Sequence, residues 1–429
     1  MTTVSQGRTG VAVIGLGGAV ATTAVVGVEH LRLGSSTTAG LPFAHRNDLI
    51  PYESLVFGGW DVQGEDLAKA AHVHRVLEPA LIEAVASQLE QIEPWSAVAD
   101  PAYCRNATGT NIVGIGPLRG RVAHVRNDLR RFREERDLDR VVVVNLASTE
   151  AWPDLTSPVL ADLDTFEKGL DLDEDVITPG MIYAYAAITE GCPFINFTPS
   201  QGPDVPALLE LAARENVPVA GKDGKTGQTM IKTVIAPALR SRALKVEGWY
   251  STNILGNRDG QILDNPSSLA SKLNTKGSVL DSILGYDVVD HIVRIDYYRP
   301  RGDAKEAWDN IDLIGFMGHR MQLKIDFLCR DSILAAPLVL AATRSGSSPA
   351  TSAAQLRAKA RWAAEPSACA TRTRLRSPIS RNGPGTAARR WAVNRAATAV
   401  NGDPASPPAP APARARRARG RCRRASGVP

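Results

Sequence analysis

Short apolar runs alternate with helical stretches through the first 244 residues of this 429-residue chain. Four runs are expected to form buried strands: Val11–Ile14, Val141–Leu146, Phe194–Phe197 and Val217–Ala220. Helical periodicity extends over residues 64–94, 117–136, 179–190, 205–215 and 230–244. This alternation is typical of a parallel α/β sheet, which binds its ligands at the carboxyl ends of the strands. The polar residues expected at that edge are Asn145, Ser148, Asn196, Thr198 and Ser200.

Residues 221–229 (GKDGKTGQT) connect the last of these strands to the last of these helices. The segment combines glycines with a carboxylate, lysines and hydroxyl groups. Backbone N–H groups and the positive end of the helix dipole would face this turn. The segment therefore predicts a site for an anionic ligand.

A glycine-rich turn follows the first strand. Gly15, Gly17 and Gly18 precede a helix expected from Ala19 to about Leu33, and glycines there let a backbone approach a pyrophosphate. Val20 replaces the third glycine of the usual pattern, so a plain strand-to-helix turn is the alternative. Asp61 is the candidate for the ribose-binding acid, although residues 35–53 would then be an insertion.

The pattern changes after residue 244. Residues 246–255, 291–298 and 321–327 alternate in the manner of antiparallel strands, and the last convincing helix begins at Asp331. We therefore expect a Rossmann-like dinucleotide-binding domain over residues 1–244 and a second, α+β domain over residues 245–340.

Charge is distributed very unevenly. Residues 341–429 contain 18 Arg or Lys and two acids, a net charge of +16; subtracting this from the whole-chain +5 leaves residues 1–340 at −11. This basic, Pro- and Ala-rich tail is typical of a disordered segment, and out-of-frame reading of a GC-rich gene is the preferred explanation. Nucleic-acid binding is expected only non-specifically, through this tail.

The arginines of residues 119–136 are interleaved with acids, which favours a solvated helix face over a nucleic-acid site. His72 and His74 are expected to cover a surface.

Five scattered cysteines without a CxxC pair indicate a reducing compartment, and no segment after residue 28 is long and apolar enough to span a membrane. Glycines interrupt the signal-like stretch 11–28, so a cytoplasmic protein is expected.

Nine motifs occur in a family-specific order: GLGGAVATT, FGGWDV, NLAST, INFTPS, GKDGKTGQT, NILGNRDG, SKLNTK, GDAK and CRDSILAAP. On these motifs, residues 10–340 resemble the inositol-3-phosphate synthase (myo-inositol-1-phosphate synthase) family, and its archaeal-type branch most closely. The resemblance implies cyclisation of glucose 6-phosphate by an NAD that is reduced and reoxidised within one cycle. It also implies a homotetramer assembled through the second domain, and a role in inositol and phospholipid biosynthesis.

The resemblance also implies roles for individual residues. Catalytic roles fall on Lys225, Lys272, Lys276, Lys305, Asp223 and Asp331. Cofactor contacts fall on Gly15, Gly17, Gly18, Ala19, Val20, Asp61, Asn145, Ser148, Thr198, Ser200 and Asp223. Substrate contacts fall on Gly227, Gln228, Thr229, Asn253, Lys272, Lys276 and Lys305. Asp259 is the candidate ligand of a divalent cation. Clustered lysines suit this chemistry, because mutual repulsion lowers the pKa of one of them and the others stabilise oxyanions.

Two positions depart from the family pattern. Lys222 stands where Asn or Asp is usual, and would add a third cation beside Lys225. After Leu340 the family's helix and its aromatic-aromatic-Lys segment are missing, and the only later lysine is Lys359. Three alternatives therefore stay open: a folded but impaired synthase, an NAD(P)-dependent dehydrogenase with net oxidation, and a non-catalytic protein that binds acidic partners through its tail.

Overall fold

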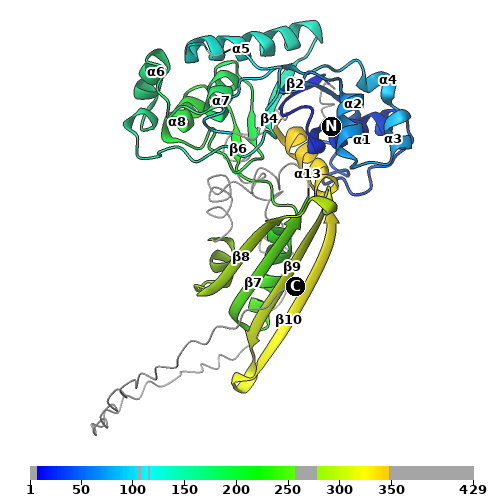
Figure 1. Cartoon of the computed structure of the whole chain (residues 1–429), viewed down its shortest axis with the longest axis vertical. Coiled ribbons are helices and arrows are strands. Elements are labelled where there is room, and N and C mark those ends of the chain that lie inside the picture. The colour runs from blue at the N-terminus through cyan, green and yellow to red at the C-terminus, as the bar shows by residue number, and fades with distance from the viewer. Residues whose placement is uncertain (1–6, 105–107, 115, 257–277, 347–429) are drawn as a thin grey trace, which may run out of the picture. The chain divides into compact units, whose positions relative to one another are not determined.

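The computed structural model describes residues 7–104, 108–114, 116–256 and 278–346 (Figure 1). Its first sheet is six-stranded and entirely parallel, in the order β3-β2-β1-β4-β5-β6. The strands are β1 (Thr9–Ile14), β2 (Leu55–Asp61), β3 (Trp95–Ser96), β4 (Arg140–Asn145), β5 (Phe194–Asn196) and β6 (Val219–Gly221). The predicted parallel α/β sheet is confirmed.

Successive residues of the central strands face two separate cores. Val11 and Val13 of β1 pack with α1 (Ala19–Arg32) and α13 (Asp331–Gly346), whereas Ala12 and Ile14 pack on the opposite face. That second face is covered by α5 (Leu118–Glu135), α6 (Leu163–Asp171), α7 (Pro179–Thr189) and α8 (Pro206–Arg214). Burial on both faces explains why these strands are nearly all apolar.

The expected long helix over residues 64–94 is instead three short ones: α2 (Leu67–His74), α3 (Pro79–Glu83) and α4 (Ala86–Leu89). Asp66 caps α2 by accepting from the Lys69 N–H, and Arg75 ends the helix in a left-handed conformation, so the periodicity is interrupted there. The described residues also form four short 3-10 helices: η1 (Tyr52–Ser54), η2 (Pro158–Leu160), η3 (Arg299–Arg301) and η4 (Phe316–Gly318).

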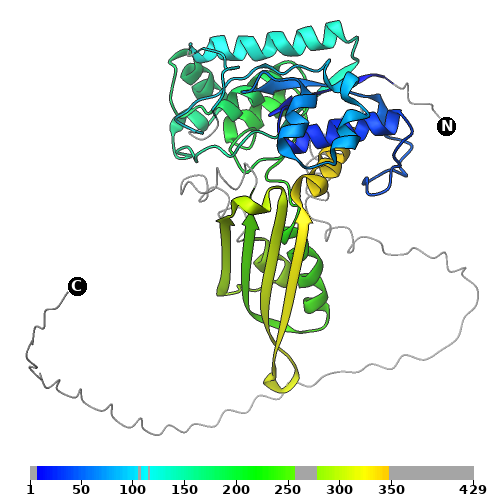
Figure 2. The same cartoon turned by 45° about the vertical axis from the view of Figure 1, so that its right-hand side comes forward.

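The second sheet has four strands in the order β10-β9-β7-β8 (Figure 2). They are β7 (Lys245–Leu255), β8 (Asp290–Tyr297), β9 (Ala304–Ile314) and β10 (Arg320–Arg330). The expectation of antiparallel strands was wrong for β8, which pairs parallel with β7. A connection that contains the helix α12 (Ser278–Leu284) precedes β8, and helical crossovers produce parallel pairing.

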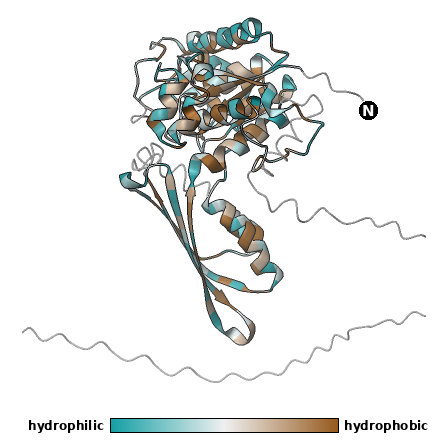
Figure 3. Cartoon of the chain, turned by 90° about the vertical axis from the view of Figure 1, so that its right-hand side faces the viewer, coloured by the Kyte–Doolittle hydropathy of each residue, from teal (hydrophilic) through white to brown (hydrophobic). Residues whose placement is uncertain are grey.

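One face of the second sheet is covered by α9 (Gln228–Ser241) and α12, and the strands alternate between apolar and polar residues (Figure 3). Strand β9 escaped prediction because its buried row contains charged residues. Lys305 and Asp309 alternate there with Ala307, Ile311 and Leu313. Charged residues in the buried row remove the apolar–polar alternation by which such a strand is recognised in a sequence.

Helix α13 continues to Gly346, past residue 340 where the tail was expected to begin. The guanidinium of Arg344 is buried and donates to the carbonyls of Phe43 (3.0 Å), Arg46 (3.2 Å), Leu49 (3.3 Å) and Ile50, and it lies 4.2 Å from the Tyr52 ring. Arg344 therefore fastens the inserted segment before β2 to the end of α13.

Replacing Arg344 by Met should lower the free energy of unfolding by about 3 kcal/mol, because it leaves several carbonyls near the core without a donor. Urea denaturation measures the change. The matched control is Arg320→Met, which removes an exposed partner of Glu247 and should cost less than about 0.5 kcal/mol. Equal losses in the two variants would contradict a structural role for Arg344.

Candidate active site

One cavity of about 1240 Å³ lies at the carboxyl ends of the first sheet. Its lining brings together the glycine turn, the end of β2, the ends of β4 and β5, segment 223–229 and the residues that flank β9 and begin α13. Pockets for single small ligands are about 300–1,000 Å³, so this one has room for more than one small molecule.

The glycine turn is held against the end of β2. Gly15 has a positive φ of 86°, and the N–H groups of Gly15 and Leu16 donate to the Trp60 carbonyl at 2.8 and 3.0 Å. The Gly17 N–H donates to the Asp61 carboxylate at 2.9 Å. A Cβ on Gly17 would lie 3.2 Å from that carboxylate oxygen, so a larger residue here would have to displace Asp61 by a few tenths of an ångström.

His74 takes part in the same turn. Its Nε2 lies 2.7 Å from the Gly17 carbonyl, and the side chain is only partly exposed. The expectation that both histidines cover a surface was therefore wrong for His74 and correct for the exposed His72. The α2 residues that bring His74 here carry no motif, so the sequence alone gave no signal for it.

These residues fit a dinucleotide. Gly18 precedes α1 and no side chain caps this helix, so its first N–H groups face the cavity as a pyrophosphate site requires. Asp61, on the neighbouring strand end, lies where a ribose hydroxyl is usually bound. Ala19 and Val20 line the same wall.

Four predicted polar residues lie at or just after the ends of β4 and β5, and not all of them line the cavity. Asn145, Ser148 and Thr198 line the cavity. Ser200 does not: it is buried, and its hydroxyl accepts from the Glu150 N–H at 2.9 Å. Ser200 supports the loop behind the cofactor region, so direct contact with the cofactor stays a prediction without support.

The segment 221–229 places its charged side chains in two directions. The Lys225 ammonium donates to Asp223 at 2.5 Å in the cavity wall, where Asp223 is buried and Lys225 is largely buried. Lys222 instead pairs with Asp204 at 2.8 Å and lies 4.7 Å from the Trp152 ring. The expected third cation beside Lys225 is therefore absent from the described lining.

Asp331 joins this segment to the second sheet. One carboxylate oxygen accepts from the Thr226 hydroxyl at 2.7 Å and from the Lys305 ammonium at 3.2 Å. Lys305 is buried, at the start of β9, and a Cβ on Gly227 would lie 3.8 Å from its ammonium nitrogen. Lys305, Asp331 and the phosphate-type turn thus meet in one wall, as the motifs predict.

The first turn of α9 completes this wall. Gly227, Gln228 and Thr229 line the cavity, and no side chain caps the helix. Asn253 does not line it; this residue is buried behind Gln228, and its Nδ2 donates to Gln228 Oε1 at 2.7 Å. Its predicted direct contact with the substrate stays a prediction.

Three predicted residues, Lys272, Lys276 and Asp259, lie outside the described residues. Within the described ranges, no cluster of three His, Cys, Asp or Glu side chains could hold a metal ion. No helix of the described part is long and apolar enough to cross a membrane.

Glu150 is a cavity-lining acid that the sequence did not single out as a site residue. It accepts from the Gly180 N–H at 2.9 Å, and complete burial raises the pKa of its carboxyl to about 7. Burial favours the neutral acid, because desolvation penalises the charge. No periodicity or motif marks this residue; only the folded environment does.

The raised pKa of Glu150 predicts a pH dependence of stability. Between its ordinary pKa of 4.5 and about 7, the unfolded chain binds fewer protons than the folded one, so stability falls as pH rises through this window. Between these two pH values the free energy of unfolding of the wild-type protein should fall by about 3 kcal/mol, and that of Glu150→Gln should not fall. Urea denaturation at a series of pH values tests this, and parallel curves for the two proteins would contradict it.

The fold and the site define a Rossmann-like dinucleotide-binding enzyme. The sequence profile of the NAD-binding domain of myo-inositol-1-phosphate synthase matches residues 29–344. The inositol-3-phosphate synthase 1 of Bacteroides thetaiotaomicron is 43% identical over 359 residues, covering 78% of this chain and 83% of that protein. The chain belongs to the myo-inositol-1-phosphate synthase family.

More distant relatives agree. Inositol-3-phosphate synthase 1 of Oryza sativa is 34% identical over 309 residues, covering 70% of this chain and 60% of that protein. The crystal structure of inositol-3-phosphate synthase from Caenorhabditis elegans superposes with a TM-score of 0.74 at 29% identity, covering 79% of this chain and 74% of that one. Membership of the archaeal-type branch stays a prediction.

Proposed function

We propose that this protein converts D-glucose 6-phosphate to 1D-myo-inositol 3-phosphate. The observation that carries the proposal is that one cavity joins the dinucleotide turn at Gly15–Gly18 to the ion pair of the buried Lys305 with Asp331. The named relatives support the same reaction. NAD bound at the glycine turn would accept a hydride from the sugar and return it, so the reaction has no net NADH.

The chain's own residues supply the remaining requirements. The first turn of α9 presents backbone N–H groups to the sugar phosphate. Lys305 is buried and Lys225 is largely buried, and both cations would stabilise negative charge on substrate oxygens. Asp223 and Asp331 hold these ammonium groups in place, while burial strengthens their effect. Lys272 and Lys276 are proposed to act beside them, from the family motif alone.

The lysines provide a direct test. Lys305→Met should lower kcat for inositol phosphate formation by at least about 10³-fold, and Lys225→Met by about 10²-fold, because a preorganised cation is lost from the cavity. Lys222→Met is the matched control: it removes a lysine of the same segment that pairs outward, and its activity should stay within about twofold. A loss in Lys222→Met as large as that in Lys225→Met would contradict the assignment.

A second candidate is a folded but impaired synthase, since the family's C-terminal lysine segment is not present after Leu340. A version whose later residues are restored to the family pattern distinguishes the two. Turnover only in the restored protein favours the impaired synthase, and equal turnover in both favours the first candidate. A dehydrogenase with net oxidation would accumulate NADH instead.

Use of a divalent cation at Asp259 and a cytoplasmic location both stay predictions.

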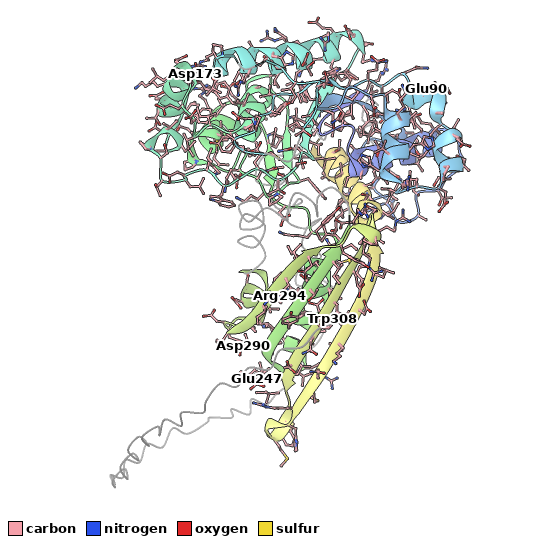
Figure 4. All side chains as sticks on the ribbon, viewed as in Figure 1. Glu90, Asp173, Glu247, Asp290, Arg294 and Trp308 are labelled. Atoms are coloured by element: carbon pink, nitrogen blue, oxygen red, sulfur yellow. The ribbon has the colours of Figure 1, made fainter. Side chains whose placement is uncertain are left out.

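We infer that the protein is a homotetramer assembled through the open face of the second sheet. The residues of this face alternate with the buried ones and include Tyr250, Ile292, Arg294, Trp308 and Leu328; Figure 4 labels Arg294 on β8 and Trp308 on β9. Ile292, Trp308 and Leu328 are 46%, 43% and 60% exposed. The same face also carries charged residues, among them Asp290, Arg294, Glu306 and Asp326, and a mixture of apolar and charged side chains is usual at protein interfaces.

Trp308→Asp should therefore dissociate the assembly, because it replaces a large apolar side chain of this face by a charge. Analytical ultracentrifugation measures the mass. Leu172→Asp is the control, since Leu172 is an exposed apolar residue at the end of α6, away from this sheet. A Trp308→Asp protein with the mass of the unaltered assembly would contradict the proposed interface.

A further inference from the structure

A buried polar network lies directly beneath the first turn of α9. Its centre is Asp309 in the middle of β9, where the residue is 1% exposed. One carboxylate oxygen of Asp309 accepts from Trp249 Nε1 and from Ser251 Oγ, each at 2.6 Å, and from Gln228 Nε2 at 3.4 Å. A carboxylate in a core is costly unless it is hydrogen-bonded in this way.

The amide of Gln228 is held at both ends. Its nitrogen donates to Asp309, and its oxygen accepts from Asn253 Nδ2 at 2.7 Å. Gln228 is 2% exposed, and it is also the first residue of α9 and part of the cavity lining. The rotamer of this side chain, and with it the position of the first helical turn, is therefore fixed from below.

The charge of Asp309 is balanced from the same helix. Lys232 lies one turn after Gln228, is 2% exposed, and donates to His291 Nε2 at 2.6 Å. Burial and the neighbouring ammonium lower the pKa of His291 to about 4, so the imidazole is neutral and accepts this hydrogen bond. Burial lowers the pKa of Lys232 to about 8, and the negative charge of Asp309 opposes this shift.

Gln228 and Thr229 border the cavity where α9 has no capping side chain. The N–H groups of the first turn have no partner within the helix, so an anion at this point depends on their direction. A change in the Gln228 rotamer would shift these donors relative to the anion. Asp309 does not line the cavity, so any effect on binding would pass through Gln228.

We propose that Asp309 is a positioning residue for phosphate recognition: acting through Gln228, it holds the first turn of α9 in the geometry that binds the phosphate of the substrate. This inference rests on the proposed function, because it takes the anion to be the phosphate of a sugar phosphate. Lys232 keeps the carboxylate from repelling that anion. Neither residue is among the candidate site residues of the family motifs.

The direction in which Asp309→Asn changes phosphate affinity distinguishes a positioning role from a direct effect of the Asp309 charge. Removing a negative charge near the phosphate would strengthen anion binding if charge alone mattered. Asp309→Asn should instead weaken glucose 6-phosphate binding to the NAD-loaded protein by about tenfold, as measured by calorimetry, and raise KM more than it lowers kcat. NAD affinity should not change.

Two further variants show whether Asp309 acts through Gln228. Gln228→Ala should weaken binding to a similar extent, and adding Asp309→Asn to it should cause no further loss. Trp249→Phe is the matched control, because it removes a different donor from the same carboxylate oxygen and leaves Gln228 bound. Asn253→Ala releases the other end of the Gln228 amide, and should reproduce the loss if Asp309→Asn does not fold.

Unchanged or stronger binding by Asp309→Asn would overturn the inference. So would a double variant whose loss of affinity is the product of the two single losses, or a Trp249→Phe variant that loses as much affinity as Asp309→Asn. If the wild-type protein does not bind glucose 6-phosphate, the proposed function fails. Inorganic phosphate then serves as the probe, and a tenfold loss in Asp309→Asn still supports the positioning role. No binding of phosphate to the wild-type protein would overturn both.

Discussion

The hydrogen bonds of the Asp331 carboxylate connect the parts of the molecule on which the site depends. Asp331 is the first residue of α13, where its charge also suits the positive end of the helix dipole. From there it binds Thr226 of the segment before α9 and Lys305 of β9. Segment 221–229, the second sheet and α13 thus meet at one partly buried acid. Asp331 holds the Lys305 ammonium at the cavity wall, and the Thr226 hydroxyl holds the same carboxylate oxygen.

Hydrogen bonds also hold the glycine turn on the cofactor side of the cavity. The glycine turn, β2 and His74 are joined by hydrogen bonds to Gly17 and Asp61, and these leave little freedom in the turn. Arg344 then fastens the insertion before β2 to the end of α13. The insertion that made the spacing between Gly15 and Asp61 irregular is accommodated at the edge of the fold, and Asp61 still reaches the glycine turn.

Much of this could be predicted from the sequence, because the central strands are buried on both faces and read as plain apolar runs. The glycine turn, Asp61, Lys225 and Lys305 line one cavity, and their individual roles stay predictions. What could not be predicted depends on tertiary environment. Strand β9 was missed since its buried row includes Lys305 and Asp309, and β8 was given the wrong direction since the connection before it contains a helix. Glu150 and His74 carry no local pattern at all.

The most direct test is to incubate the whole chain with glucose 6-phosphate and NAD, and to follow inositol phosphate and NADH together. A synthase built on this cavity forms inositol phosphate in proportion to the sugar phosphate consumed, with no net NADH. Consumption of glucose 6-phosphate with accumulating NADH and no inositol phosphate would contradict the assignment.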